Sequence, residues 1–342
     1  MPYPDGYQSV LSKEQKQFWL ENGFIKIPQC FSREQSDAFT SSLWVRLDAD
    51  PNEEAGYQAH REEESTGPHS CVVQRVCPKA YSAMCELVGG EEKIDEWCKD
   101  WKDGFIPNLG KPEYSPDELL DYRTLDDGDW FTPFLDSPEQ ALLVIPLFSD
   151  IKPKGGGTVI CTDGIKLVAQ VLHDHPDGTT PFLTPRGSPN IPKSNPDRRK
   201  LWRSWVQDPS LTRDESFHEA TSEVGDVYLL QLCLSYPFML HSASRNPRRD
   251  IRIITNPPVS LKEPFNYDGK NPSLVEQKTL RDLGHPEGLP NWKITSPRER
   301  IIPDRVTQQQ KMKRQELERL KARGMNVTEI AGARPHDQYY PS

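Results

Sequence analysis

The chain has 342 residues, of which 27% are charged and 35% hydrophobic, and it contains 32 prolines. This composition is typical of a folded globular protein with long polar loops. It disfavours a helical bundle, because proline removes a backbone donor from a helix. The formal net charge of −9 disfavours nucleic acid as a partner, since a phosphate backbone would be repelled.

Membrane and secreted classes are also disfavoured. The sequence has no apolar run of 18 or more residues, and its first residues lack the basic and apolar regions of a signal peptide. The seven cysteines form no CxxC pair, which indicates reduced thiols instead of a disulfide framework or a zinc site. We therefore expect a cytoplasmic protein without a membrane partner.

Two capping-box patterns lie near the start of the chain. Residues 12–15 (Ser-Lys-Glu-Gln) predict a helix that ends at Asn22-Gly23, and residues 32–35 (Ser-Arg-Glu-Gln) predict a second helix to about Leu47. Between them, residues 24–27 alternate in polarity and predict a short strand. The next stretch, 48–70, is polar and predicts a surface loop, and 78–87 has helical spacing before a glycine pair.

Strand signals are concentrated in the second half of the chain. Four apolar runs are bounded by glycine or proline, as in a sandwich or jelly roll: residues 142–145, 158–161, 227–230 and 251–255. Residues 176–215 are rich in Pro, Ser, Arg and Asp and predict an inserted loop, either a lid or a mobile segment. Residues 304–323 predict a surface helix. We expect one domain over 1–303, followed by a C-terminal helix and tail over 304–342.

Candidate site residues are far apart in the sequence. Asn246 follows His241 by five residues and Arg252 follows it by eleven, while Asp127 lies upstream in the run Asp-Asp-Gly-Asp. Taken singly, His241 is typical of a packed histidine and Asp127 of a turn. Arg252 lies between two isoleucines and needs an anionic partner, which is either an internal carboxylate or a bound anion.

In this order, the motifs resemble the phytanoyl-CoA dioxygenase family of Fe(II)- and 2-oxoglutarate-dependent oxygenases, and residues 131–148 and 254–261 resemble its fungal members. The resemblance implies a mainly β protein with flanking helices, folded as a double-stranded β-helix (jelly roll, cupin-like). It implies that Asp127 and His241 bind iron and that Arg252 pairs with the distal carboxylate of 2-oxoglutarate. The implied activity is that of an oxidoreductase, a dioxygenase that hydroxylates or oxidises a small organic molecule.

The sequence departs from this family at Leu125. The family has a metal-binding histidine two residues before the aspartate, and leucine cannot coordinate a metal ion. A second departure is the segment 231–236, which makes the approach to His241 longer. The alternative function is therefore a catalytically degenerate relative that binds a ligand or acts as a partner subunit. Three aromatic residues after Asp127 either line an apolar pocket or belong to the core: Trp130, Phe131 and Phe134.

Two further motifs are predicted to have no catalytic role. Residues 173–177 contain two histidines and two aspartates, but they begin the polar insertion and are predicted to form a solvent-exposed loop. The glycines at 155–157 predict a turn and not a phosphate-binding loop, because no Gly-Lys-Ser/Thr follows them.

Overall fold

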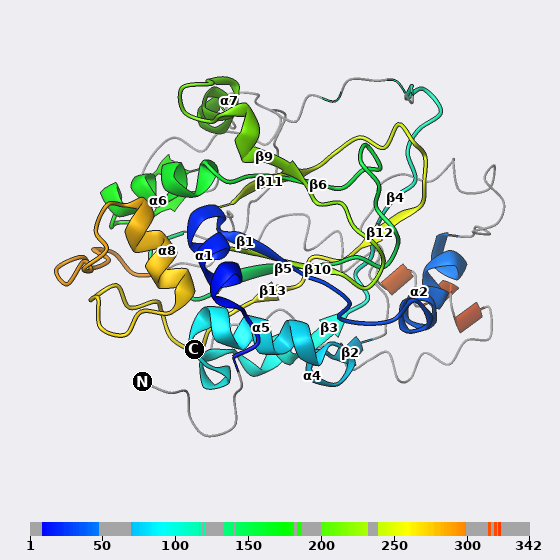
Figure 1. Cartoon of the computed structure of the whole chain (residues 1–342), viewed down its shortest axis with the longest axis horizontal. Coiled ribbons are helices and arrows are strands. Elements are labelled where there is room, and N and C mark those ends of the chain that lie inside the picture. The colour runs from blue at the N-terminus through cyan, green and yellow to red at the C-terminus, as the bar shows by residue number, and fades with distance from the viewer. Residues whose placement is uncertain are drawn as a thin grey trace.

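Antiparallel strands in two layers cross the centre of the molecule, and helices surround them (Figure 1). The computed structural model describes residues 9–47, 70–115, 117, 120, 133–139, 141–180, 183–186, 200–231 and 239–298, with short helical pieces at 314–315, 318–319 and 321–322.

The first layer is a four-stranded sheet in the order β1-β10-β5-β13, with every pair antiparallel. Its strands are β1 (Phe24–Ile27), β10 (Val227–Gln231), β5 (Leu142–Pro146) and β13 (Pro258–Val259). All residues of β5 and β10 are buried. Their uninterrupted apolar sequences agree with strands that are covered on both faces.

The second layer is a three-stranded antiparallel sheet in the order β11-β6-β9. Its strands are β11 (Leu240–Ala243), β6 (Thr158–Cys161) and β9 (Phe217–Glu219). The ring of His218 on β9 lies 5.4 Å from the ring of Phe24 on β1. This contact brings the two layers face to face.

A short strand pair extends the first layer. Strand β12 (Arg252–Ile254) pairs with β4 (Ile106–Asn108). An isolated bridge between Leu147 and Ile254 joins this pair to the end of β5, and the Phe148 N–H donates to the Ile253 carbonyl at 2.9 Å.

Helices and smaller strands enclose these layers. The contact between α1 (Lys13–Asn22) and α8 (Leu274–Asp282) contains the buried indole of Trp19, which donates to the Leu274 carbonyl at 3.2 Å. The other elements are α2 (Arg33–Leu47), β2 (Ser70–Val72), α4 (Val73–Val76), α5 (Pro78–Val88), η1 (Glu91–Lys93), η2 (Glu96–Lys99), β3 (Asp100–Lys102), α6 (Gly164–Asp174), β7 (Thr179–Thr180), β8 (Thr184–Pro185), α7 (Lys200–Gln207) and η4 (Asp214–Ser216).

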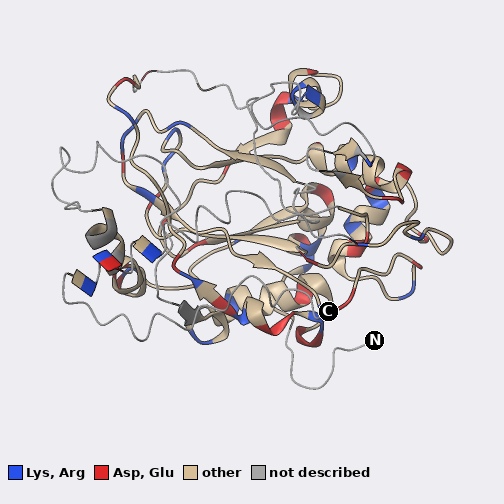
Figure 2. Ribbon diagram, turned by 180° about the vertical axis from the view of Figure 1, so that it is seen from behind, with Lys and Arg blue, Asp and Glu red and all other residues tan. Residues whose placement is uncertain are grey.

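Charged residues lie mainly on the helices and loops. In the view of Figure 2, basic and acidic residues alternate along these segments, while the strands are mostly uncharged. Among the described helices, none combines the length and the apolar character that a membrane span requires.

The predicted N-terminal elements are confirmed. Ser12 and Gln15 form a reciprocal capping box at the start of α1, and Gly23 ends the helix in the left-handed conformation. Ser32 and Gln35 repeat the pattern at α2, where Gln35 N–H donates to Ser32 Oγ and Ser32 N–H to Gln35 Oε1. Helix α5 and the four predicted strands also form, with β12 shorter than expected.

The segment 176–215 differs from the predicted loop. Its described residues include the β7–β8 pair and helix α7. In α7, Trp205 and Val206 are buried in the hydrophobic core, and Leu201 packs against it. This apolar face stabilises a helix that the polar composition of the surrounding segment concealed. Of the loop expected at 48–70, residues 48–69 lie outside the described residues, and Ser70 begins β2.

The chain before α1 is anchored to α5 by one carboxylate. Glu86 accepts hydrogen bonds from the backbone N–H groups of Val10 and Leu11 at 3.0 and 3.1 Å and from Ser9 Oγ at 2.7 Å, and it pairs with Lys16 at 2.6 Å. Burial alone would raise the pKa of Glu86, but the hydrogen bonds from Lys16, Ser9 and Leu11 outweigh it and hold the pKa below its usual range.

Glu86→Gln should lower the free energy of unfolding at neutral pH by about 1–3 kcal/mol, because a charged acceptor is lost from a buried network. The pKa of Glu86 is lower in the folded than in the unfolded chain, so its contribution is present above the unfolded pKa and is lost as the pH falls through the folded pKa. Urea unfolding from neutral to acidic pH should therefore show a shrinking difference between the two proteins. The exposed Glu92, changed to Gln, is the control, and a difference independent of pH would contradict this account.

Candidate functional site

His241 lies on β11 and faces the space between the two layers. It pairs with Ile160 of β6, and Ile160 pairs in turn with His218 of β9. Directly paired residues of neighbouring strands project from the same face of a sheet. Because His218 contacts Phe24 of the first layer, His241 is on the inward face as well. Burial lowers the pKa of His218, which favours its neutral form.

The orientation of the His241 ring is set by its own strand. Its Nδ1 lies 3.2 Å from the carbonyl oxygen of Met239. A carbonyl only accepts hydrogen bonds, so this contact requires the proton on Nδ1 and leaves the lone pair on Nε2. Metal-binding histidines commonly have this arrangement, with one nitrogen donating to a carbonyl and the other bearing the lone pair.

Arg252 is buried, with 1% of its surface exposed. Its Nε donates to the carbonyl of Gly156 at 2.7 Å, and Nη1 donates to the carbonyl of Ile106 at 2.8 Å. The backbone of Arg252 pairs with Asn108 of β4. Both acceptors are backbone carbonyls, and the two bonds set the orientation of the guanidinium.

Asn246 braces the loop between His241 and Arg252. It is fully buried, and its Nδ2 donates to the carbonyls of Asn108 at 2.9 Å and Asp250 at 2.7 Å. Asn108 in turn donates through Nδ2 to the carbonyl of Ser244 at 2.9 Å. The spacing of His241, Asn246 and Arg252 had singled out Asn246, and its contacts give it a structural role.

The glycine turn before β6 supplies the acceptor for Arg252. Gly156 has φ +81°, and a Cβ there would lie 2.7 Å from Asn108 Nδ2 and 2.9 Å from Asn246 Cβ. Only glycine combines this backbone conformation with so close an approach. The turn was predicted from the three glycines, whereas its contacts with Arg252 and Asn246 had no signal in the local sequence.

Several predicted residues lie outside the described part of the chain. They are Leu125, Asp127, Trp130 and Phe131, together with 232–236 of the longer segment before His241 and Asp304 of the C-terminal helix. Phe134 is described and fully buried, with the Arg298 guanidinium 5.1 Å from its ring centre. The described pieces between 314 and 322 are helical.

The histidine-rich segment at 173–177 is partly exposed. His173 lies in the last turn of α6 and its Nδ1 is 2.9 Å from Asp174 Oδ1, while His175 Nδ1 is 4.0 Å from Asp177 Oδ1. Across the described ranges, no three His, Cys, Asp or Glu side chains are grouped as a metal site requires. The segment differs from the predicted loop at its start, because His173 and Asp174 belong to the last turn of α6, and only residues 175–177 follow the helix.

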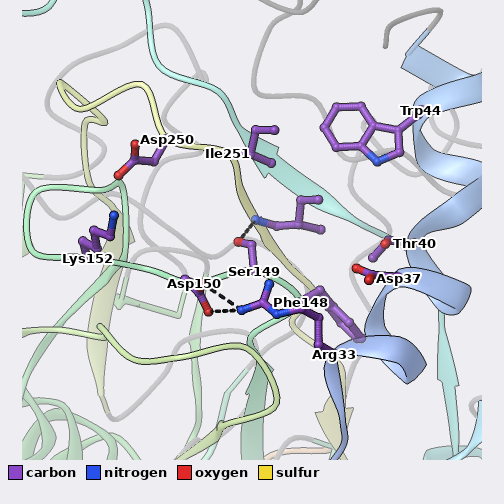
Figure 3. A pocket seen from close by; sticks show the side chains of 11 residues that line it. Arg33, Asp37, Thr40, Trp44, Phe148, Ser149, Asp150, Lys152, Asp250 and Ile251 are labelled. Carbon is purple, nitrogen blue, oxygen red and sulfur yellow. Dashed lines mark hydrogen bonds and ion pairs between the residues drawn. The ribbon is translucent and has the colours of Figure 1, made fainter. Parts of the chain in front are cut away.

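A pocket of about 550 Å³ lies between α2 and the segments around Ser149 and Ile251 (Figure 3). Ile251 and Ile253 line it, and these neighbours of Arg252 project from the other face of the strand. Arg33 of α2 also lines the pocket, and its Nη2 donates to both carboxylate oxygens of Asp150 at 2.9 Å in an exposed ion pair. The pocket therefore lies against the face of β12 that is opposite the Arg252 side chain.

Comparisons with known proteins leave the family open. No protein-family model matches the chain. Small integral membrane protein 19 from Danio rerio is 37% identical over 67 residues, which is 19% of this chain and 64% of that protein, so the chain spans less than two thirds of this relative.

Three of the similar solved structures each cover about three quarters of this chain. SnoK, a non-heme alpha-ketoglutarate-dependent carbocyclase from nogalamycin biosynthesis, is 14% identical with a TM-score of 0.38, and the match covers 75% of this chain and 87% of SnoK. HygX from Streptomyces hygroscopicus, with nickel and 2-oxoglutarate bound, is 13% identical with a TM-score of 0.36, and the match covers 72% of this chain and 85% of HygX. EctD from S. alaskensis is 14% identical with a TM-score of 0.38, and the match covers 76% of this chain and 79% of EctD. At these identities and TM-scores, inference about activity rests on this chain's own residues.

Gly156→Ala should lower the free energy of unfolding more than Gly284→Ala does. Both glycines have positive φ, +81° and +76°, where a Cβ costs about 1–2 kcal/mol, but only Gly156 faces close neighbours. The excess should be about 1–3 kcal/mol, as expected for overpacking. Urea unfolding of the two variants measures it, and equal losses would show that the turn is not tightly packed against the asparagines.

Proposed function

We propose that the protein is an Fe(II)- and 2-oxoglutarate-dependent oxygenase that hydroxylates or oxidises a small organic molecule, built on a double-stranded β-helix. The observation that carries this proposal is the preorganised guanidinium of Arg252. A planar guanidinium matches a carboxylate in a bidentate contact. Because two carbonyls already set its orientation, binding of an oxoacid carboxylate needs little rearrangement of the arginine.

Among the described residues, His241 is the one that we propose as a metal ligand. Its Nδ1 faces the Met239 carbonyl, so Nε2 carries the lone pair that a metal ligand needs. Asp127 is the proposed second ligand, on the strength of the family resemblance. Bound iron would supply the oxygen chemistry, while this chain's residues hold the metal, orient the oxoacid and position the substrate.

The order of strands supports the jelly-roll proposal. His241 lies on β11 of the three-stranded layer, and Arg252 lies on the next strand, β12, in the extension of the four-stranded layer. The two residues thus come from successive strands in facing layers.

We also propose a cytoplasmic location. Burial raises the pKa of Cys30 and Cys98 to about 12, which keeps these free thiols protonated and unreactive.

The direct test is anaerobic calorimetric titration with Fe(II), followed by 2-oxoglutarate, and then oxygen consumption on admission of air. We expect oxoacid binding that depends on the metal. Absence of metal-dependent binding would contradict the oxygenase proposal.

The second candidate function is a degenerate relative that binds a ligand or a partner without turnover. The residue that favours it is Leu125, because a first ligand is then missing from the proposed metal site. Loss of a metal ligand should weaken binding by more than the roughly 10–100-fold that changes in outer-shell partners cause.

Arg252→Lys should weaken 2-oxoglutarate binding at least about tenfold, as losses of positioning contacts do. Lysine keeps the charge but cannot present the two parallel N–H groups of a guanidinium. Calorimetry under anaerobic conditions measures the change. The exposed Arg248 pairs with Asp250 at 2.9 Å, and its replacement by Lys is the matched control. Equal oxoacid affinity in Arg252→Lys and the native protein would assign Arg252 a structural role alone.

Leu125→His separates the two candidate functions. If Leu125 occupies the family's histidine position, it shares a strand face with Asp127, two residues on. Histidine there should raise Fe(II) affinity and oxoacid decarboxylation together, because it restores a third protein ligand. Oxygen consumption is compared between the two proteins. Rapid turnover by the native protein would show that another residue completes the metal site, and no gain from the histidine would show that Leu125 does not face the metal.

A further inference from the structure

We infer that Glu219 is a positioning residue for oxoacid recognition, because its carboxylate holds the glycine turn that carries the acceptor of Arg252. The inference rests on the proposed function and names a residue that the family resemblance does not include. Glu219 ends β9 and is paired with Val159 of β6.

The carboxylate of Glu219 holds both ends of the turn at residues 154–157. Its Oε2 accepts a hydrogen bond from the Lys154 N–H at 2.8 Å, and Oε1 accepts one from the Gly157 N–H at 3.1 Å. Ser244 Oγ also lies 3.3 Å from Oε1. Each oxygen therefore receives at least one backbone donor.

The same turn contacts Arg252 through Gly156, the residue directly before the Gly157 that Glu219 holds. The Gly156 carbonyl accepts from Arg252 Nε at 2.7 Å. The next carbonyl, that of Gly157, accepts from Ser244 Oγ at 2.8 Å and from Ser244 N–H at 3.2 Å. A shift of the turn would move the Nε acceptor, and with it the plane in which the guanidinium meets a carboxylate.

Glu219 acts from the face of the sheet opposite His241. Val159 pairs with both Glu219 and Ser242, whereas the adjacent Ile160 pairs with His218 and His241. Neighbouring residues of a strand project from opposite faces. Glu219 is therefore outside the proposed metal site, and its effect on the oxoacid passes through the turn.

A carboxylate suits this position for a chemical reason. The backbone N–H groups of Lys154 and Gly157 are at separate points of the turn, and the two oxygens of a carboxylate accept from each of them. Glutamine offers one oxygen and one NH₂ group, so one backbone donor would face another donor and lose its partner. Glu219→Gln thus loosens the turn while conserving the size of the side chain.

The experiment compares the native protein with Glu219→Gln. With Fe(II) bound under anaerobic conditions, calorimetry measures the affinity for 2-oxoglutarate and for 2-oxobutanoate, which lacks the distal carboxylate. Fe(II) affinity is measured separately. We expect Glu219→Gln to lose about 10- to 100-fold in 2-oxoglutarate affinity, as outer-shell substitutions do. Its affinities for 2-oxobutanoate and Fe(II) should stay unchanged, so its preference for the dicarboxylate shrinks.

Glu223→Gln is the matched control, since it makes the same chemical change at an exposed position four residues away and should leave the preference unchanged. If Glu219→Gln does not fold, Ser244→Ala replaces it. That variant removes the hydroxyl contacts with Gly157 and Glu219 and should reduce the preference in the same direction.

Three outcomes would overturn the inference in distinguishable ways. An undiminished preference in Glu219→Gln, with the native protein preferring 2-oxoglutarate, removes the positioning role and leaves the oxygenase proposal intact. A parallel loss of Fe(II) and both oxoacids assigns Glu219 a general structural role. A native protein that does not prefer 2-oxoglutarate removes the proposed function and the role of Glu219 together.

Discussion

The buried guanidinium of Arg252 is the contact on which the arrangement of the candidate site depends. It connects its own strand to Ile106 of β4 and to Gly156 of the turn before β6. Hydrogen bonds that involve a charged donor contribute about 1.5–3 kcal/mol each, and an unpaired buried carbonyl is costly. The arginine therefore holds the extension of one layer against the start of a strand in the other.

This contact explains why the surrounding residues are so specific. Gly156 must bring its backbone close to Asn108 and Asn246, which leaves no room for a side chain. Asn246 ties the loop after β11 to β4 through its amide group. These contacts restrict the path of the chain between His241 and Arg252. The sequence spacing of His241, Asn246 and Arg252 therefore follows from the distance that the connecting loop has to cross.

Side chains in the three-stranded sheet alternate between its two faces, and the two faces differ in their proposed roles. One row, with His218, Ile160 and His241, faces the other layer, while Glu219, Val159 and Ser242 form the row on the opposite face. Groups suited to binding are on the inward row. The carboxylate that holds the glycine turn is on the outward row, so the proposed chemistry and its structural support come from the two faces of one sheet.

Local sequence determined the helix caps, the buried strands and the glycine turn, because each has a signal within a few neighbouring positions. His241 and Arg252 became candidates for the site only through their spacing and the family resemblance, since each one taken singly also fits a structural role. It did not predict α7, whose apolar face is embedded in a polar stretch, or the part played by Glu219. The contacts of Glu219 join residues 62 and 65 positions apart. Only the tertiary structure brings such groups together, since strand pairing and layer packing, which no short window of sequence contains, decide which distant donors and acceptors meet.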